Sequence, residues 1–409
     1  MKILLLRLSS MGDVLHTLPA VTDMWQARPD LCLHWLVEPA FAPIAQLHPG
    51  VTRVIPFSLR VHKERWRGLA AALRDLRRSL RSERYEHILD AQGLYKSALL
   101  GRLGGSPLWG LDAASAREPG ASRLYHRRFR VAWGQSAISR NRQLFAQALD
   151  YPLPETPSDY GLQVAAARLR KDTLAQPWGE LVQQPFVLGF HGTSWENKEW
   201  QEDYWRALAT PLKQAGLRLL LPAGSAREAA RARRIAEQAD NVVALPPATL
   251  LELAALIVRA DAYVGMDTGL SYLAGALGLA GVTLYGPTAS GRFSVAESRQ
   301  ATLQSSEPCS PCGKSRCALP EAKNGLIVCQ QSLRPEQVWT ALSPLLEHRY
   351  ARQQLVAFRQ IPGAEAVQGQ VRHAQGITSL LLQTVMGFVG CRGTQVQYRA
   401  ETILLLPVP

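Results

Sequence analysis

The chain has 409 residues, of which 47% are hydrophobic and 19% are charged. Because a domain usually has roughly 100–200 residues, this length excludes a single small module, and the high apolar content excludes a disordered chain. The 46 Lys and Arg residues outnumber the 33 Asp and Glu residues, which gives a formal net charge of +13. Such a basic surface favours polyanionic partners: nucleic acid, phosphorylated small molecules or an anionic membrane.

The first residues do not resemble a secretion signal. Only the apolar run 3–6 separates Lys2 from Arg7, and this run is too short for the apolar region of a signal peptide. The window closest to a membrane span, residues 376–390, is interrupted by polar residues and is shorter than the span of about 18 residues that a membrane requires. We therefore expect a cytoplasmic protein whose membrane contact is peripheral.

The first half of the chain alternates short apolar runs with helical patterns. Residues 3–8 are predicted to form a strand, residues 9–13 a turn and residues 14–28 an amphipathic helix. Further predicted elements are strands at 33–37 and 88–91 and a helix with Leu69, Leu73, Leu76 and Leu80 on one face. Strands that alternate with helices indicate a parallel sheet.

A turn-rich segment with three prolines, residues 151–157, interrupts this alternation and indicates a domain boundary between about 155 and 185. The second half has predicted strands at 186–190, 217–221, 242–244, 262–265 and 282–285 and predicted helices that include 202–215 and 250–259. We predict an α/β protein with two Rossmann-like, doubly wound domains that face each other across a cleft. The predicted domains are 1–165 and 166–348, and the tail 349–409 has no assigned chemistry.

In open parallel sheets, ligands bind at the carboxyl ends of the strands, so the loops that follow the strands contain the candidate functional residues. The first of these loops ends at Asp13. Its carboxylate is placed either to cap the following helix or to act as a general base toward a nearby hydroxyl. The spacing alone leaves both roles open.

Two loops of the second half contain groups suited to a phosphorylated ligand. In one, the hydroxyls of Thr193 and Ser194 suit phosphate oxygens and Lys198 supplies a point charge, although Lys198 also fits an ordinary surface lysine. In the other, glycines around Asp267 permit a diphosphate to approach the start of the next helix. Asp267 then either accepts hydrogen bonds from sugar hydroxyls or caps that helix.

No G-x-G-x-x-G or G-x-x-x-x-G-K-[ST] pattern follows a predicted strand, and Gly275, Gly278 and Gly281 have the wrong spacing. These two patterns bind dinucleotides and nucleoside triphosphates through backbone amides. A dinucleotide-dependent dehydrogenase and a P-loop enzyme are therefore disfavoured.

Five stretches of the chain form a recognisable series: residues 9–20, residues 90–98, Ala116-Arg117-Glu118-Pro119, residues 267–271 and Tyr285-Gly286-Pro287-Thr288. In this order they resemble the ADP-heptose:lipopolysaccharide heptosyltransferases of glycosyltransferase family 9, over about residues 1–345. The resemblance implies a GT-B fold whose first domain binds mainly the acceptor and whose second binds the nucleotide sugar. The implied reaction moves L-glycero-D-manno-heptose from ADP-heptose to the inner 3-deoxy-D-manno-octulosonic acid (Kdo) of Kdo2-lipid A, with inversion at the anomeric carbon.

The same resemblance implies roles for individual residues. Asp13 is the implied catalytic base, and neither a cofactor nor a bound metal is expected. The implied donor-binding residues are Thr193, Ser194, Lys198, Glu228, Asp267, Thr268, Gly269, Leu270 and Tyr272. Glu228 is placed to accept the ribose hydroxyls, although it also fits a carboxylate in the first turn of a helix. The implied acceptor-binding residues are Arg60, Gln92 and Arg117, which suit the Kdo carboxylates and lipid A phosphates.

Two features depart from or add to this pattern. The family stretch usually continues Asp-Thr-Gly-Leu-Ser-His, but here Tyr272 replaces the histidine, and a phenol donates a hydrogen bond without carrying positive charge. Cysteines 309, 312, 317 and 329 are spaced C-x2-C-x4-C-x11-C. Four thiolates suit zinc, but zinc sites usually pair two C-x2-C units, so we predict reduced thiols and no metal.

The helix that carries the leucine stripe also carries Arg74, Arg77, Arg78 and Arg81. These arginines fit either a solvated face or an anionic phospholipid surface, and the second alternative places the enzyme at the cytoplasmic face of the inner membrane. One alternative function is another transferase of the family that acts on an already heptosylated core. A second is a basic nucleic-acid-binding protein, but no recognised nucleic-acid motif supports it, and we predict no nucleic-acid partner.

Overall fold

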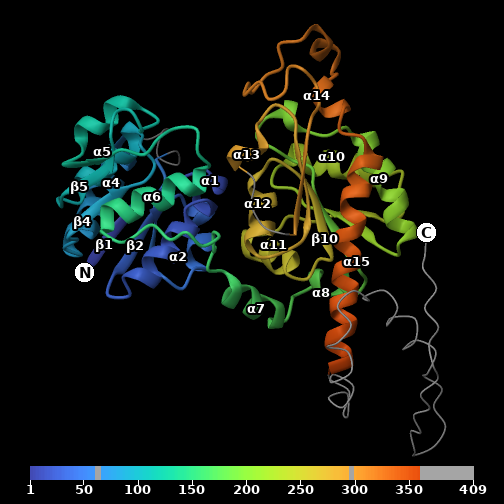
Figure 1. Ribbon diagram of the computed structural model, residues 1–409, viewed down its shortest axis with the longest axis horizontal. Coiled ribbons are helices and arrows are strands. Elements are labelled where there is room, and N and C mark those ends of the chain that lie inside the picture. The colour runs from blue at the N-terminus through green and yellow to red at the C-terminus, as the bar shows by residue number, and fades with distance from the viewer. Residues whose placement is uncertain (60–65, 294–298, 360–409) are drawn as a thin grey trace, which may run out of the picture. The chain divides into compact units, whose positions relative to one another are not determined.

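The computed structural model describes residues 1–59, 66–293 and 299–359 (Figure 1). The chain divides into two compact units, Met1–Leu345 and Leu346–Pro409. The first unit contains both β-sheets and every candidate site residue that the structure describes. Arg60 lies outside the described residues.

The first sheet has six parallel strands in the order β3-β2-β1-β4-β5-β6. The strands are β1 (Lys2–Leu6), β2 (Cys32–Val37), β3 (Val51–Pro56), β4 (His87–Asp90), β5 (Leu108–Leu111) and β6 (Arg127–Phe129). Its helices are α1 (Met11–Leu15), α2 (Leu18–Ala27), α3 (Ala42–Gln46), α4 (Trp66–Ser82), α5 (Tyr95–Leu103) and α6 (Ala137–Leu149). The residues of β1 from Ile3 to Leu6 are fully buried, as expected for a strand whose two faces are both covered.

The second sheet is also parallel, in the order β12-β11-β10-β7-β8-β9. The strands are β7 (Phe186–Phe190), β8 (Arg218–Leu221), β9 (Val242–Ala244), β10 (Ala262–Met266), β11 (Gly281–Tyr285) and β12 (Gln300–Gln304). The helices of this half are α7 (Gln163–Lys171), α8 (Trp178–Leu181), α9 (Glu202–Gln214), α10 (Ala226–Ala236), α11 (Leu250–Ile257), α12 (Gly269–Ala276), α13 (Ser290–Phe293), α14 (Val328–Gln331) and α15 (Pro335–Arg359). Short 3-10 helices occur at Pro39–Phe41, Pro119–Leu124, Glu196–Lys198 and Pro320–Asn324.

The prediction of an α/β protein with two doubly wound sheets is confirmed, while the residue limits of the two domains and the tail stay predictions. The single helix predicted at 14–28 is wrong. The segment forms two helices, α1 and α2, which are separated at His16 and Thr17. Proline lacks a backbone N–H and is favoured at a helix start, and Pro19 is the second residue of α2. Because α1 begins at Met11, Asp13 lies inside its first turn rather than before it.

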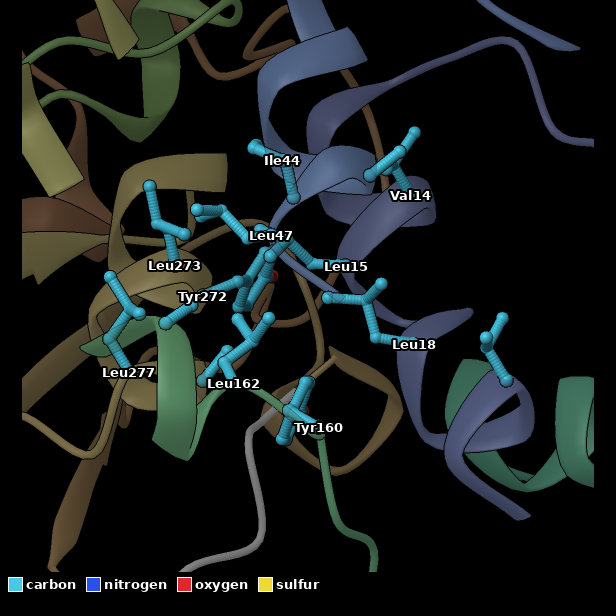
Figure 2. Close-up of a cluster of buried hydrophobic side chains, with 14 of the residues drawn as sticks. Val14, Leu15, Leu18, Ile44, Leu47, Tyr160, Leu162, Tyr272, Leu273 and Leu277 are labelled. Carbon is cyan, nitrogen blue, oxygen red and sulfur yellow. The ribbon is translucent and has the colours of Figure 1, made fainter. Parts of the chain in front are cut away.

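One hydrophobic cluster contains buried side chains from both halves of the first unit (Figure 2). Helix α12 contributes Tyr272 and Leu273, its C-cap residue Leu277 also belongs to the cluster, and the segment between the two halves contributes Tyr160 and Leu162. The first half contributes Val14, Leu15, Leu18, Ile44 and Leu47. Burial of these side chains accompanies the packing of α1 against α12 and of α3 against α11.

Helix α1 approaches α12 closely at a glycine. A Cβ atom placed on Gly269, the first residue of α12, would lie 2.4 Å from Cε and 2.9 Å from Cβ of Met11, the first residue of α1. Real Cβ atoms do not approach other carbons this closely, since core contacts lie near 3.5–4.0 Å. Glycine at 269 is thus a condition for this helix contact.

We predict that Gly269→Ala lowers the free energy of unfolding by about 1–3 kcal/mol, the usual cost of forcing an extra carbon into packed space. Adding Met11→Ala should recover part of this loss, because it removes the atoms that the new methyl group meets. Denaturant titration measures both effects. Gly291→Ala is the matched control, since a Cβ there meets nothing within 4 Å. Equal losses in Gly269→Ala with and without Met11→Ala would contradict the predicted contact.

Candidate active site

Asp13 is the third residue of α1 and lies just beyond the carboxyl end of β1. Its Oδ2 accepts hydrogen bonds from the backbone N–H of Ser10 at 3.0 Å and from the Ser10 hydroxyl at 3.2 Å. Asp13 is therefore not the N-cap of a helix that begins at Val14: the N-cap of α1 is Ser10, and Asp13 accepts its backbone N–H from the third position of the helix, in a capping box. Both bonds use Oδ2, and none of the hydrogen bonds found among the described residues uses Oδ1. The carboxylate thus keeps one oxygen that is able to accept a proton.

Gln92 holds the loop that precedes Asp13. Its Oε1 accepts from the Leu8 N–H at 2.8 Å, and its Nε2 donates to the Ser9 carbonyl at 3.2 Å. Lys96, at the start of α5, reaches the Ser9 hydroxyl at 3.4 Å. Gln92 therefore positions the loop after β1, whichever further contacts it makes to a ligand.

Asp90 fixes the turn that carries Gln92. Its carboxylate accepts the backbone N–H groups of Gln92 and Gly93 and the hydroxyls of Ser97 and Tyr125, at 2.7–3.2 Å. Complete burial raises the pKa of Asp90, while these hydrogen bonds oppose the rise. The turn is consequently held by backbone as well as side-chain donors.

Two arginines of the first half have opposite surroundings. Arg117 is exposed, so its guanidinium is available to an anion in solution. Arg7 is buried and donates to the Thr17 hydroxyl at 3.2 Å and the Asn141 side-chain oxygen at 2.5 Å. Burial lowers the pKa of Arg7 and the neighbouring Asp13 carboxylate raises it. Sequence reasoning missed Arg7, because it treated this residue only as part of the first strand.

The carboxylate of Asp267 accepts hydrogen bonds from three side chains of the second half. Its Oδ2 accepts from Nζ of Lys198 at 2.5 Å and from the hydroxyl of Thr288 at 2.6 Å, and its Oδ1 accepts from the hydroxyl of Tyr272. The Lys198 Nζ also lies 3.3 Å from the Asp267 carbonyl. The structure therefore brings together three of the proposed donor residues and adds Thr288, which belongs to the quoted stretch 285–288 but received no role.

This arrangement decides two alternatives that the sequence left open. The side chain of Lys198 is 13% exposed and that of Asp267 is 5% exposed, so the interpretation of Lys198 as an ordinary surface lysine is wrong. The N-cap of α12 is Thr268, so the interpretation of Asp267 as that cap is also wrong. A buried carboxylate requires a cation and hydrogen-bond donors, and Lys198 supplies the charge.

The loop that carries Lys198 is held by a hydrogen bond from one of its own side chains to its backbone. Thr193 is buried, and its hydroxyl donates to the Trp195 carbonyl at 2.5 Å. Lys198 lies over the Trp195 ring with Nζ 4.6 Å from the ring centroid, which is a cation–π distance. Ser194 is exposed. Thr193 therefore shapes the loop, and Ser194 presents its side chain to solvent.

Glu228 lies in the first turn of α10, where the Ser225 hydroxyl caps the helix. Its Oε2 accepts the Gly224 N–H at 2.7 Å. A Cβ atom placed on Gly192 would lie 2.5 Å from the Glu228 carboxyl carbon. The first-turn position is therefore observed, and it places the carboxyl group directly beside the loop that carries Thr193.

The four cysteines line one small pocket of about 120 Å³. Burial raises the pKa of Cys329 to about 12. In the part of the chain that the structure describes, no three His, Cys, Asp or Glu side chains form a group that could hold a metal ion. The segment with these cysteines supports the donor loops: the Asn197 side chain donates to the Lys314 carbonyl at 2.8 Å, and the Gly313 N–H donates to the Pro287 carbonyl at 2.7 Å.

The site thus consists of two sets of residues at the carboxyl ends of parallel strands. The first contains a carboxylate with one uncommitted oxygen, Asp13, and the exposed cation Arg117. The second contains a partly buried lysine, hydroxyl groups and the start of α12. Lysine, hydroxyls and helix amides suit a diphosphate, and a carboxylate suits proton removal from an alcohol. These groups have the chemistry needed to transfer a sugar from a nucleotide diphosphate to a hydroxyl.

Comparisons with known proteins agree with this chemistry. Residues 73–323 match the family model described as glycosyltransferase family 9 (heptosyltransferase). The chain is 42% identical over 358 residues to lipopolysaccharide heptosyltransferase 1 of Pseudomonas aeruginosa strain PAO1, covering 85% of this chain and 98% of that protein.

Solved structures extend the likeness to three dimensions. Escherichia coli heptosyltransferase WaaC with ADP-2-deoxy-2-fluoro heptose matches with a TM-score of 0.66 and 37% identity, over 75% of this chain and 93% of that one. Escherichia coli ADP-heptose lipopolysaccharide heptosyltransferase II matches with a TM-score of 0.63 and 21% identity, over 86% and 100%, which supports the GT-B fold alone. The chain belongs to glycosyltransferase family 9, the heptosyltransferases.

Proposed function

We propose that this chain is a lipopolysaccharide heptosyltransferase I. It transfers L-glycero-D-manno-heptose from ADP-heptose to the inner Kdo of Kdo2-lipid A, in the biosynthesis of the lipopolysaccharide inner core. The observation that carries the proposal is the packing of α1, which bears Asp13, against the start of α12, where the donor-binding residues begin. The similarity to heptosyltransferase 1 of Pseudomonas aeruginosa supports the choice of acceptor.

In the proposed mechanism, Asp13 is the general base. Its uncommitted Oδ1 takes the proton of the acceptor hydroxyl while the acceptor oxygen attacks the anomeric carbon of heptose. The bond between that carbon and the phosphate oxygen breaks, and ADP leaves with the electron pair. One displacement inverts the anomeric configuration. A positioned general base contributes roughly 10²–10⁴-fold to the rate.

The donor's charge is met by groups of the second half. Lys198, Thr193, Ser194 and the amides of Thr268 and Gly269 stabilise the diphosphate, whose negative charge grows as ADP leaves. Leu270 lines this part of the site. Glu228 accepts hydrogen bonds from the ribose hydroxyls, and Asp267 accepts from the heptose. This set requires no cofactor.

The acceptor is bound by the first half. Arg117 and Arg60 receive the Kdo carboxylates and lipid A phosphates, since guanidinium groups form paired hydrogen bonds with such oxyanions. Gln92 supports the loop after β1 and contacts the acceptor from there.

Product analysis tests the choice of acceptor. With ADP-heptose as donor, we expect the purified protein to add one heptose to Kdo2-lipid A and none to an acceptor that already carries the first heptose. Mass spectrometry of the two reactions measures this difference. Preferential transfer to the heptosylated acceptor would instead assign the chain to heptosyltransferase II.

Asp13→Asn tests the base. Asparagine retains an oxygen that can accept from Ser10 and so preserves the start of α1, but it cannot take a proton. We expect kcat to fall at least about a hundredfold while the unfolding temperature and ADP binding stay near those of the wild type. Asp240→Asn, at an exposed residue paired with Lys213, is the matched control. Near-wild-type turnover of Asp13→Asn would contradict the assignment of Asp13 as the general base.

We further propose that the protein works in the cytoplasm, attached peripherally to the inner membrane. Among the residues that the structure describes, no helix is long and apolar enough to cross a bilayer. Helix α4 exposes Arg74, Arg77, Arg78 and Arg81 and buries Leu76 and Leu80. The adjacent α5 exposes Tyr95 and Leu99, with side chains 49% and 57% accessible. Arginines beside exposed apolar side chains suit an anionic lipid surface.

Vesicle flotation measures this attachment. We expect recovery with vesicles that contain phosphatidylglycerol, less recovery with purely zwitterionic vesicles, and loss at high salt, because each basic residue contributes about 1 kcal/mol through screened attraction. Arg77→Glu combined with Arg78→Glu should reduce recovery while kcat on a detergent-dispersed acceptor stays unchanged. Recovery that is independent of lipid charge and salt would exclude this mode of attachment.

A further inference from the structure

Tyr272 lies on α12 where this helix meets α1. Its side chain is buried, its ring centroid lies 4.7 Å from that of His16, and a Cβ placed on Gly12 would lie 3.1 Å from two of its ring carbons. It belongs to the same hydrophobic cluster as Leu15 and Leu47 (Figure 2). The ring is therefore packed against the helix that carries Asp13.

The hydroxyl of Tyr272 has a single proton, and it donates that proton to Oδ1 of Asp267. A diphosphate oxygen at neutral pH accepts hydrogen bonds and does not donate them. While the phenol is bonded to Asp267, it has no proton left for a diphosphate. A direct hydrogen bond from Tyr272 to the diphosphate would therefore require its hydroxyl to leave Asp267.

The hydrogen bonds of Asp267 indicate what this contact achieves. An ionised carboxylate offers about four acceptor positions, two on each oxygen. Lys198 and Thr288 both donate to Oδ2, and Tyr272 takes one position on Oδ1. One acceptor position on Oδ1 remains, which is enough for one hydroxyl of a sugar.

We propose that Tyr272 is a positioning residue. Its hydroxyl orients the remaining acceptor position of Asp267 toward the transferred sugar. Its ring packs against α1 and so fixes the position of the Asp267 carboxylate relative to Asp13. It does not bind the diphosphate. This inference rests on the proposed function, because it takes the sugar of the donor as the ligand of Asp267. It assigns this chain a different role for residue 272 from the direct contact expected of the usual histidine.

Tyr272→Phe tests the role, because it keeps the ring and removes only the hydroxyl. We expect kcat/KM for ADP-heptose to fall about tenfold, the typical effect of losing a hydrogen bond to a charged group. The dissociation constant of ADP, measured by calorimetry, should stay within about twofold of the wild type, since ADP carries the diphosphate but no heptose. The two readouts together separate sugar positioning from diphosphate binding.

Tyr263→Phe is the matched control. Tyr263 is buried in β10, and its hydroxyl is bonded to Thr283 and Gln300. This variant loses a buried hydroxyl of the same sheet, so its unfolding temperature should fall, while both kcat/KM and ADP affinity stay unchanged. Any general loss of stability is thereby measured apart from the effect at the site.

If the wild type is active, either of two results would overturn the role of Tyr272 and leave the proposed function intact. If ADP affinity of Tyr272→Phe falls in proportion to kcat/KM, the phenol binds the diphosphate. If kcat/KM matches that of the control, the hydroxyl positions nothing that the reaction uses. Failure of the wild type to transfer heptose would instead overturn the proposed function, and this inference with it.

Discussion

The buried carboxylate of Asp267 is the constraint on which the donor half of the site depends. Removing a carboxylate from water is costly unless a cation and hydrogen-bond donors satisfy it. Here the cation comes from the segment after β7, one hydroxyl from the segment after β11 and another from α12. Strands β7, β10 and β11 are neighbours in the sheet, so their carboxyl ends meet at one edge. Satisfying one carboxylate thus fixes the relative positions of three loops.

The close contacts between the loops of the site depend on two glycines, which have no side chain. At Gly192 a methyl group would strike the Glu228 carboxyl, and at Gly269 it would strike Met11. The first glycine lets the carboxylate proposed for the ribose lie against the Lys198 loop. The second lets the amides at the start of α12 lie beside α1. The loops therefore contain small residues for a packing reason, in addition to any contact that they make with a ligand.

Much of the fold could be predicted because its central strands are short, mainly apolar runs followed by turn residues. Strands β7 and β9 have the predicted limits, and loops follow β1, β7 and β10 where the sequence predicted them. The strands β3, β5, β6 and β12 were not predicted. Of these, β3, β6 and β12 are edge strands with exposed or partly exposed residues, so they lack the continuous apolar run that identifies a buried strand.

What could not be predicted from the sequence is which residues of the candidate site contact one another. Lys198 and Asp267 are 69 residues apart in the chain, and nothing in the local pattern around either residue indicates the other. The start of α1 was misplaced for a local reason. Serine at the N-cap and aspartate at the third position form a capping box, whereas apolar spacing places the helix start at the aliphatic residue Val14. Side-chain capping, rather than hydrophobic periodicity, determines this boundary.

The contact between α1 and α12 also limits how the two halves of the site can move. Leu15 and Leu273 are fully buried in the cluster that contains Tyr272, and exposing a leucine side chain costs about 1.5–3 kcal/mol. Separating the two helices would expose several such side chains at once. A rotation about the contact keeps them buried and therefore costs less. The contact therefore favours arrangements in which the first turn of α1, which bears Asp13, stays beside the start of α12.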